Sequence, residues 1–315
     1  MKQFIKSILL FVLILLVFYP ILVCIWGLVM PSFLKPNLNY YLGGYGHMYS
    51  RLNEAKKIKK VDCLIIGSSL AYRGFDTRIL NDSGISSFNL GSSSQTPLQT
   101  KVLLKKYLTR LSPNRIIYVV DPDAFTSDGV ESSLDLISND RNDINTIKMA
   151  IAVHHIKVFN TLIFACMRDA LKLNNKFAEP VCKDDDIYIN GGYVEKKISY
   201  FKNVTYPVQR WKFNPKQLKS FSENISIIKS MRIPYILVNT PVTTALYKSY
   251  TNNNEFDSIM NAYGRYYNFN GKIKLNDSLD FYDEVHLNQE GVRKFDSSLI
   301  KLLDSVFTAV PFFNE

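Results

Sequence analysis

One uncharged apolar run near the N-terminus constrains this 315-residue chain more than any other feature. The run extends from Ser7 to Met30, follows Lys2 and Lys6, and stops at Pro31. At about 1.5 Å of rise per residue, a helix of this length reaches about 36 Å, which is enough to cross a hydrocarbon core of about 30 Å. The sequence therefore predicts a single membrane-spanning helix, and the lipid bilayer around residues 7–30 is its first expected partner.

The run has the wrong form for a secretion signal. The apolar region of a cleaved signal peptide has about 7–15 residues and ends at a small-residue site, which Pro31-Ser32-Phe33 does not provide. Cys24 follows Leu22-Val23, where a lipoprotein signal requires a small residue, so the sequence disfavours lipidation. We therefore expect the anchor to be retained.

Positive charge sets the expected orientation of this anchor. Lys2 and Lys6 precede the run, whereas the first basic residues after it are Lys35 and Arg51. The positive-inside rule then places the N-terminus in the cytoplasm and residues 31–315 outside it, in the periplasm or at the cell surface. A cytoplasmic domain on a reversed anchor stays open as the alternative, because only two charges decide the orientation.

The rest of the chain has the composition of a globular domain. Hydrophobic residues make up 47% of the sequence and charged residues 21%, which excludes wholesale disorder. The net charge of +10 favours an anionic partner or reflects a solvated basic surface, and the sequence leaves both open. Nucleic acid is not an expected partner, because no binding motif accompanies the charge.

The cysteines and histidines predict no cofactor and no metal site. Neighbouring positions on a helix point about 100° apart, so His154 and His155 cannot face one ion. The acidic run Asp184–Asp186 is interpreted as a solvated turn, with calcium binding the less favoured alternative. In an oxidising compartment Cys166 and Cys182 can form a bridge. None of the cysteines has the paired spacing of a zinc or redox centre: Cys24, Cys63, Cys166 and Cys182.

Beyond the anchor, short apolar runs alternate with amphipathic ones. Residues 31–60 hold prolines, a glycine turn and a basic run, and are interpreted as a linker. Strands are expected at 61–66, 87–90, 115–120 and 234–239, and helices at 76–81, 96–111, 215–231, 256–267 and 288–307. This alternation predicts a three-layer α/β/α domain over residues 61–310, with a central parallel sheet between helices.

The alternation fails between residues 123 and 213, which we interpret as an insertion. It contains a predicted helix over 144–171 and an aromatic-rich piece, and a lid and a substrate platform are its two candidate roles. The aromatic side chains either form the core of the insertion, which is favoured, or stack on sugar rings: Tyr193, Tyr200, Phe201, Tyr206 and Trp211.

Three short polar motifs lie at the ends of predicted elements. Ser69 follows the first strand, Gly91 follows the second, and Asp283 and His286 precede the last helix. The carboxyl ends of parallel strands share one edge of a sheet, so we expect these motifs to meet there. A serine nucleophile needs a base and an acid that orients it, roles that His286 and Asp283 can fill. The backbone N–H groups of Ser69 and Gly91 are the expected oxyanion donors.

These motifs resemble the sequence blocks of the SGNH (GDSL-like) hydrolase superfamily. Gly67-Ser68-Ser69-Leu70 matches the first block, with Ser68 where Asp is usual and Ser69 as the nucleophile. Gly91 matches the oxyanion glycine of the second block, and Asp283-Glu284-Val285-His286 matches the closing Asp-x-x-His block. The resemblance covers about 61–121 and 234–307 and implies a flavodoxin-like strand order and acyl transfer through an acyl-serine.

The third block of that superfamily, Gly-x-Asn-Asp, has no counterpart here. Asp121-Pro122-Asp123 follows the third predicted strand instead, so the asparagine that completes the family's oxyanion hole is unassigned. Asn239, Ser92 and Gln95 are the open candidates. Loss of one such donor costs roughly a hundredfold or more in rate.

Together with the anchor, the motifs are similar in layout to membrane-anchored SGNH proteins that acylate surface polymers. Examples are the D-alanyl transfer protein of teichoic acid modification and the alginate O-acetylation proteins. This resemblance implies an esterase or O-acyltransferase that acts on acyl esters, above all acetyl esters, of an extracytoplasmic glycan or cell-envelope polymer. It also implies a polytopic membrane O-acyltransferase as a partner.

The alternative function belongs to another class. It is a non-catalytic anchored module that binds a glycan or serves as a scaffold for such an acyltransferase. A separation of Ser69 and His286 beyond hydrogen-bonding reach would favour this module.

Overall fold

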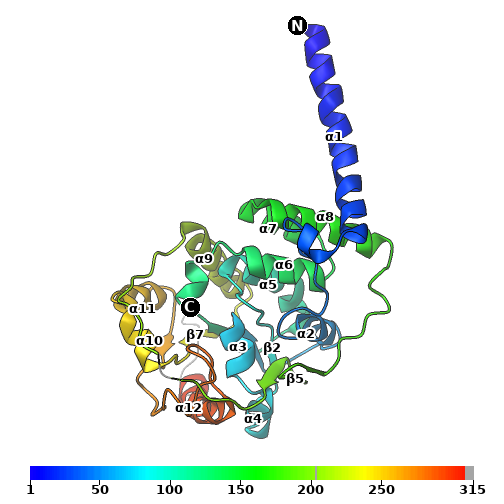
Figure 1. The fold of residues 1–315 in the computed structure, drawn as a ribbon. Helices are drawn as coiled ribbons and strands as arrows, with labels where there is room; N and C mark the ends of the chain where they lie inside the picture. The colour runs from blue at the N-terminus through cyan, green and yellow to red at the C-terminus, as the bar shows by residue number, and fades with distance from the viewer. Residues whose placement is uncertain (203, 309–315) are drawn as a thin grey trace.

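A five-stranded parallel sheet forms the centre of the domain, in a computed structural model that describes residues 1–202 and 204–308 (Figure 1). The strands lie in the order β2-β1-β3-β7-β8, and every neighbouring pair is parallel. This is the flavodoxin-like order and confirms the predicted fold class. The strands are β1 (Cys63–Ile66), β2 (Ser87–Asn89), β3 (Arg115–Val119), β7 (Tyr235–Asn239) and β8 (Tyr266–Asn268).

Helices cover both faces of the sheet because successive strand residues point to opposite faces. Leu64 and Ile66 of β1 face a core built from α2 (Met48–Ala55), α5 (Pro97–Leu111) and α9 (Pro215–Ser230). Cys63 and Ile65 face a second core built from α3 (Ser69–Gly74), α4 (Thr77–Asp82) and α12 (Gln289–Thr308). All four β1 side chains are fully buried, as expected for a central parallel strand.

Most predicted helices begin and end within a residue or two of their expected limits. Asp76 caps α4 through its carboxylate, which accepts a hydrogen bond from the N–H of Arg78. Thr96 forms a capping box with Gln99 at the start of α5, and Pro97 takes the first helical position. Asn214 caps α9 in the same way as Asp76 caps α4, with Pro215 next.

Three expectations differ from the structure. The predicted helix over 144–171 is two helices, α7 (Ile144–Val153) and α8 (Ile156–Ala170), because His154 adopts a left-handed conformation. The predicted helix over 256–267 is α11 (Asn253–Asn261) followed by the edge strand β8. The 31–60 segment is not only a linker, since it contains α2, whose Met48, Leu52 and Ala55 are fully buried.

The insertion consists of helices and a small separate sheet. α6 (Val130–Asn139), α7 and α8 come first, and an antiparallel sheet of β4 (Cys182–Lys183), β5 (Asp186–Ile189) and β6 (Tyr193–Lys196) follows. The Asp184–Asp186 run is part of this hairpin, and Arg73 of α3 pairs with both Asp186 oxygens at 2.7 and 2.8 Å. All four cysteines are free thiols, so Cys166 and Cys182 do not form a bridge.

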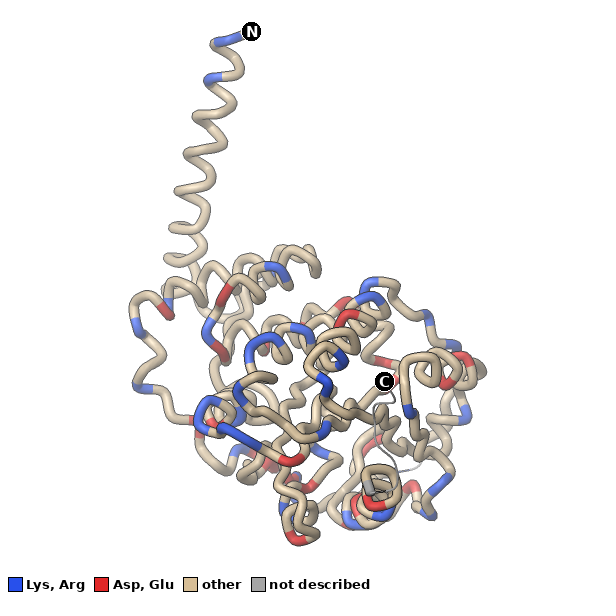
Figure 2. The backbone as a smooth tube through the Cα atoms, turned by 180° about the vertical axis from the view of Figure 1, so that it is seen from behind, with Lys and Arg blue, Asp and Glu red and all other residues tan. Residues whose placement is uncertain are grey.

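The first helix, α1 (Lys2–Val29), projects away from the domain (Figure 1). It is the one helix in the described chain that is long and apolar enough to cross a membrane, with a mean hydropathy of 3.3 in its most apolar window. Figure 2 shows charged residues on α1 only at its N-terminal end, and charges of both signs spread over the domain.

Candidate active site

A sharp turn from β1 into α3 presents Ser69 at the carboxyl edge of the sheet. Gly67 has φ +150°, and a β-carbon there would lie 2.7 Å from the Val119 carbonyl oxygen of the neighbouring strand. Ser68 then caps α3, because its hydroxyl accepts the N–H of Leu70. Ser69 is therefore the first residue of the helix, placed by a turn that only glycine fits.

Replacing Gly67 by alanine is expected to lower both stability and activity. The positive φ alone costs about 1–3 kcal/mol, and the contact with the Val119 backbone adds to it, since strand backbone cannot move aside. The measurement is thermal unfolding together with ester hydrolysis. Gly74→Ala is the matched control: Gly74 lies in the same helix with nothing within 4 Å of its added β-carbon, so its melting temperature should not fall. Equal effects of the two substitutions would contradict the expectation.

Ser69, His286 and Asp283 form one connected hydrogen-bonded chain. The Ser69 Oγ and His286 Nε2 atoms are 2.8 Å apart, although the residues are 217 positions apart in sequence. On the other side of the ring, His286 Nδ1 lies 2.8 and 3.0 Å from the two Asp283 oxygens. The structure thus brings together the three residues that the sequence assigned as nucleophile, base and orienting acid, and the separation that would have favoured a binding module is absent.

The Asp283 carboxylate is held in its charged form by its own turn. Burial alone would raise the pKa of Asp283, but the hydrogen bond and charge of His286 hold it below its usual value. The backbone N–H groups of Val285 and His286 donate to the same carboxylate at 3.0 and 2.7 Å and act in the same direction. A charged acid in this position keeps the Nδ1 proton on the ring and leaves Nε2 free to accept the serine proton.

Tyr282 supports the base from one face and was not singled out by the sequence. Its ring stacks on His286 with an interplanar angle of 1° and 5.3 Å between centroids. The N–H of Tyr282 also donates to the carbonyl of His286 at 3.1 Å. No local motif identifies this contact, since an aromatic residue before Asp-x-x-His is equally typical of a core position.

Asp121 is the second site residue whose role the sequence did not reveal. It follows β3, and its Oδ2 atom accepts the Ser68 hydroxyl at 2.8 Å. Its Oδ1 atom accepts the N–H of Ala124 at 2.9 Å. Burial, helped by the charge of Asp123, raises the pKa of Asp121 to about 6. Asp121 therefore holds the turn that carries Ser69.

We expect Asp121→Asn to change how stability depends on pH. With a folded-state pKa of about 6 against an ordinary 3.8, the folded state binds more protons than the unfolded state between these values. Wild-type stability therefore falls as pH rises through this window, by up to about 3 kcal/mol, and asparagine abolishes this fall. Denaturant unfolding of the full chain in micelles at pH 4 to 7 measures the difference. A wild-type-minus-variant difference that is the same at pH 4 and pH 7 would contradict it.

The expected oxyanion donors are near the nucleophile, but they are not equally available. The Ser69 N–H has no acceptor among the described residues, as is usual at the first position of a helix. The Gly91 N–H donates to Asn89 Oδ1 at 3.0 Å, so an oxyanion would have to share this hydrogen. Ser92 and Gln95 bind each other within the buried interior.

Asn239 is the one candidate third donor that lines the pocket beside the triad. Its amide donates one hydrogen to the Tyr266 hydroxyl at 3.2 Å, and an amide nitrogen has a second hydrogen to give. It is the last residue of β7, the strand that pairs with β3 at the site edge. The structure therefore favours Asn239 over the other two.

A small pocket opens next to the triad. Its volume is about 60 Å³, which is room for on the order of five water-sized groups. Leu70 and Val285, the neighbours of Ser69 and His286, form its near wall. Trp211 and Tyr250, stacked with 3.4 Å between ring centroids, form an aromatic wall. Polar residues among the rest of the lining are Asp121, Asn239, Asn253 and Asn270, although most of the exposed lining surface is apolar.

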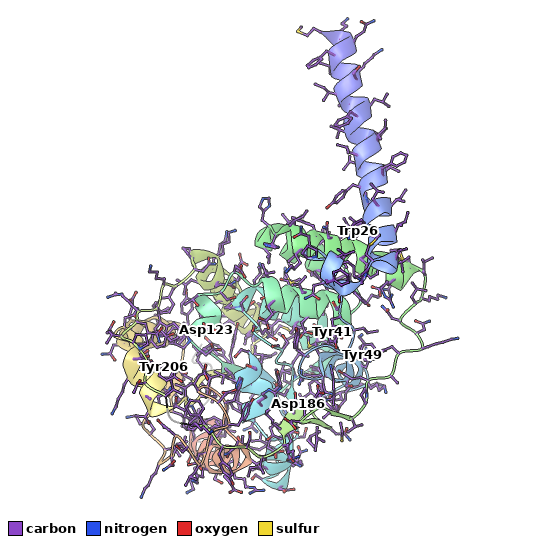
Figure 3. The ribbon with its side chains drawn as sticks, in the orientation of Figure 1. Trp26, Tyr41, Tyr49, Asp123, Asp186 and Tyr206 are labelled. Atoms are coloured by element: carbon purple, nitrogen blue, oxygen red, sulfur yellow. The ribbon has the colours of Figure 1, made fainter. Side chains whose placement is uncertain are left out.

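The end of the insertion passes over this edge of the sheet. The N–H of Phe201 donates to the Phe281 carbonyl, and Gln209 pairs with Tyr250 as an isolated β-bridge. Between these attachments, Tyr206 lies on the outer edge of the domain (Figure 3). Burial and the negative charges of Glu284 and Asp283 raise the pKa of its hydroxyl. Of the aromatic residues singled out in the sequence, Tyr193 belongs to the core, Tyr200 is exposed and Trp211 faces the pocket.

Comparison with known proteins gives only distant likenesses. No family model matches the chain, and no curated protein matches it. Among solved structures, a candidate acylhydrolase from Bacteroides fragilis is 12% identical with a TM-score of 0.41, over 82% of this chain and 97% of that one. A GDSL-like lipase from Bacteroides thetaiotaomicron is 11% identical with a TM-score of 0.39, over 82% of this chain and 98% of that one. Any assignment of activity therefore rests on the side-chain geometry.

Proposed function

We propose that this chain is a membrane-anchored serine esterase or O-acyltransferase of the SGNH type. The observation that carries the proposal is the continuous contact from Ser69 Oγ through His286 to Asp283, with 2.8 Å at each step. A serine within hydrogen-bonding distance of a histidine that is itself oriented by a carboxylate is the arrangement that activates a hydroxyl as a nucleophile.

The chemistry follows from these three groups. His286 Nε2 takes the proton of Ser69 while the serine oxygen forms a bond to the acyl carbonyl carbon. The oxyanion that develops is stabilised by the Ser69 N–H and by donors such as Asn239. His286 then returns the proton to the leaving alkoxide, which leaves an acyl-Ser69. Water or a sugar hydroxyl, deprotonated by the same histidine, then attacks the acyl carbon. The bond between this carbon and the serine oxygen breaks, and His286 returns the proton to Ser69.

The size of the pocket supports a short acyl group such as acetyl. The pocket of about 60 Å³ begins at Leu70, the residue after Ser69, and offers room for a few heavy atoms. The aromatic pair Trp211 and Tyr250 offers a flat apolar surface of the kind on which sugar rings pack. An acylated extracytoplasmic glycan or cell-envelope polymer is the proposed substrate, and a polytopic membrane O-acyltransferase the proposed partner.

The proposed location is a membrane crossed once by α1. Lys2 and Lys6 favour a cytoplasmic N-terminus, which puts the α/β domain in the periplasm or at the cell surface. There the enzyme would remain close to newly made envelope polymers, because its anchor prevents diffusion away from the membrane.

One observation favours a second candidate, the non-catalytic glycan-binding or scaffold module. The Gly91 N–H is already bound to Asn89, and the family's third block is absent, so the oxyanion site has fewer free donors than the family implies. A site that has lost these donors would bind esters without turning them over at a useful rate.

Labelling of the full chain in detergent with a fluorophosphonate, located by mass spectrometry, separates the two candidates. We expect an adduct on Ser69 that is absent in both Ser69→Ala and His286→Ala, because only an activated serine attacks phosphorus. A folded wild-type protein without an adduct would exclude the esterase and favour the binding module.

A further inference from the structure

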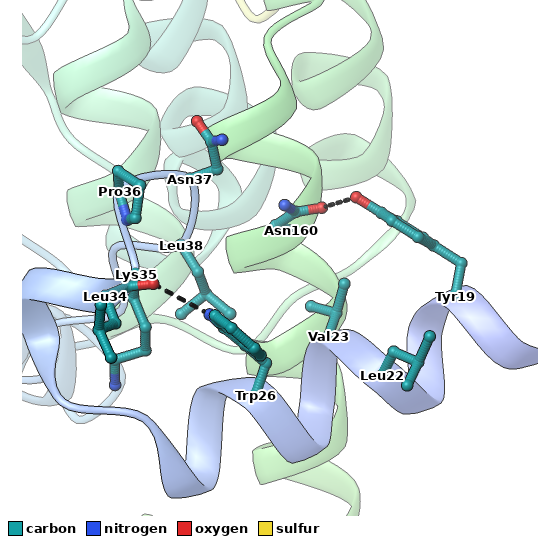
Figure 4. A pocket seen from close by; sticks show the side chains of 10 residues that line it. All are labelled: Tyr19, Leu22, Val23, Trp26, Leu34, Lys35, Pro36, Asn37, Leu38 and Asn160. Atoms are coloured by element: carbon teal, nitrogen blue, oxygen red, sulfur yellow. Dashed lines mark hydrogen bonds between the residues drawn. The ribbon is translucent and has the colours of Figure 1, made fainter.

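Helix α8 lies beside the last third of α1 (Figure 1). The Tyr19 hydroxyl donates to Asn160 Oδ1 at 2.5 Å, and Val23 is buried between the helices. Phe164 packs so closely on Gly27 that an added β-carbon there would meet its ring. Tyr19 and Gly27 are about 12 Å apart along the axis of α1, whereas Asn160 and Phe164 are only one turn apart, so α8 crosses the last third of α1 and does not merely touch its end (Figure 4).

This contact places the start of α8 at the level of the bilayer. A hydrocarbon core of about 30 Å takes about 20 helical residues, so a core that begins after Lys6 ends near Trp26. Tyr19 then lies about 10 Å inside that boundary, where its hydroxyl needs a protein partner, and Asn160 provides one. The first turn of α8 therefore lies at the depth of the headgroups and upper acyl chains. The end of α7 lies at the same depth, because it joins α8 at His154.

Helix α7 has an apolar face that the described part of the chain leaves uncovered. Ile144, Ile147 and Ile151 recur at helical spacing and are 60%, 41% and 59% exposed, while Met149 and Ala150 bury the opposite face. Ile156, at the start of α8, adds to this surface. A helix divided in this way, with one face on a domain and isoleucines outward, is typical of helices that lie in a membrane interface.

The polar groups around this face suit lipid headgroups. Lys148 of α7 lines a shallow groove together with Lys101 and Lys105 of α5, so positive charge borders the isoleucines. On the α1 side, Tyr19, Leu22, Trp26 and Leu38 line an apolar hollow of about 360 Å³ (Figure 4). The Trp26 indole in this hollow donates to the Leu34 carbonyl, as expected for an aromatic residue at the membrane boundary.

We propose that α7 and the first turn of α8 form a second membrane contact, with Ile144, Ile147, Ile151 and Ile156 inserted among phospholipids of the bilayer that α1 crosses. The proposal rests on the proposed anchoring by α1. Helix α1 crosses the membrane, and the helical hairpin of α7 and α8 lies in its surface, so the domain is fixed at two places. The domain therefore keeps one orientation relative to the membrane and holds its active site at one height above the lipid.

Depth-dependent fluorescence quenching tests this contact in the full chain. Three residues with the same exposure of 59% serve as probes when each is changed to cysteine: Leu13 in α1, Ile151 in α7, and Leu279. The residue after Leu279, Asp280, is hydrogen-bonded to the N–H of Asn288 at the start of α12, a helix at the end of the domain opposite α1 (Figure 1). Cys24→Ala, Cys166→Ser and Cys182→Ser remove the other accessible thiols, and Cys63 is fully buried. Each variant carries a bimane label in nanodiscs of phosphatidylcholine and phosphatidylglycerol.

We expect spin-labelled lipid to quench the labels at 13 and 151 at least about threefold more than the label at 279, and aqueous iodide to give the reverse order. If the label at 151 is quenched like the label at 279, while the label at 13 is still quenched by lipid, the contact of the α7–α8 hairpin with lipid is overturned and the anchor stands. A label at 13 that also behaves like 279 overturns the anchor itself. If the label at 151 is protected from iodide only when other membrane proteins are added, the proposed contact with lipid is overturned in favour of a protein partner.

Discussion

Ser69→Ala is expected to reduce hydrolysis of p-nitrophenyl acetate by on the order of 10⁴-fold or more, to the level of the oxyanion site and binding alone. The only atom removed is the Oγ that lies 2.8 Å from His286 Nε2. Alanine suits the first turn of a helix, so the free energy of unfolding should stay nearly unchanged. The measurement is kcat/KM of the full chain, together with a melting curve that shows the variant to be folded.

The adjacent serine provides the matched control. Ser68→Ala removes the contact with Asp121 and the cap of α3, but it leaves the nucleophile in place. We expect a loss of about tenfold, because a poorly held turn misplaces Ser69 without removing it. Activity that survives Ser69→Ala and disappears with Ser68→Ala would show that the nucleophile is assigned to the wrong serine.

Asp283→Asn is expected to lower the rate by about 10⁴-fold with little change in stability. The asparagine oxygen can still accept the N–H groups of Val285 and His286, which keeps the turn folded. Its amide, however, donates towards His286 Nδ1, so the ring carries its proton on Nε2 and cannot accept the one from Ser69.

Glu284→Gln is the control for this substitution. It removes a carboxylate from the same turn, but the Glu284 side chain is exposed, and the structure uses its backbone carbonyl in binding Thr243. We expect its rate to stay within about threefold of wild type, since exposed charges contribute little. Comparable losses in the two variants would show that the turn needs overall negative charge rather than an orienting acid.

The sequence predicted those features that depend on local pattern. The runs at 63–66 and 116–119 are buried and carry no charged residue, and proline and polar caps mark the starts of α5 and α9, so these elements were found close to their true limits. Asp283 and His286 form their contact within one turn. Ser69 could be joined to them because strand ends in a parallel sheet share an edge.

The features that the sequence missed depend on contacts between distant residues. β8 has only three half-buried residues, Tyr266–Asn268, and is a strand only because β7 pairs with it. The break at His154 has neither glycine nor proline to mark it. The link from Asp121 to Ser68 joins two strand ends 53 residues apart, and no local pattern around Asp121 marks it.

The base and its acid share a four-residue turn, and this has a consequence for motion. The turn is closed by the bond from the Tyr282 N–H to the His286 carbonyl and by the bridge between Phe281 and Leu287. Ser69 belongs to a different element. Thermal motion of the domain therefore changes the distance between Ser69 and His286, while the distance between His286 and Asp283 stays constant. The imidazole of His286 therefore stays oriented by Asp283 during such motions. The catalytic arrangement is restored once the distance between Ser69 Oγ and His286 Nε2 returns to hydrogen-bonding length.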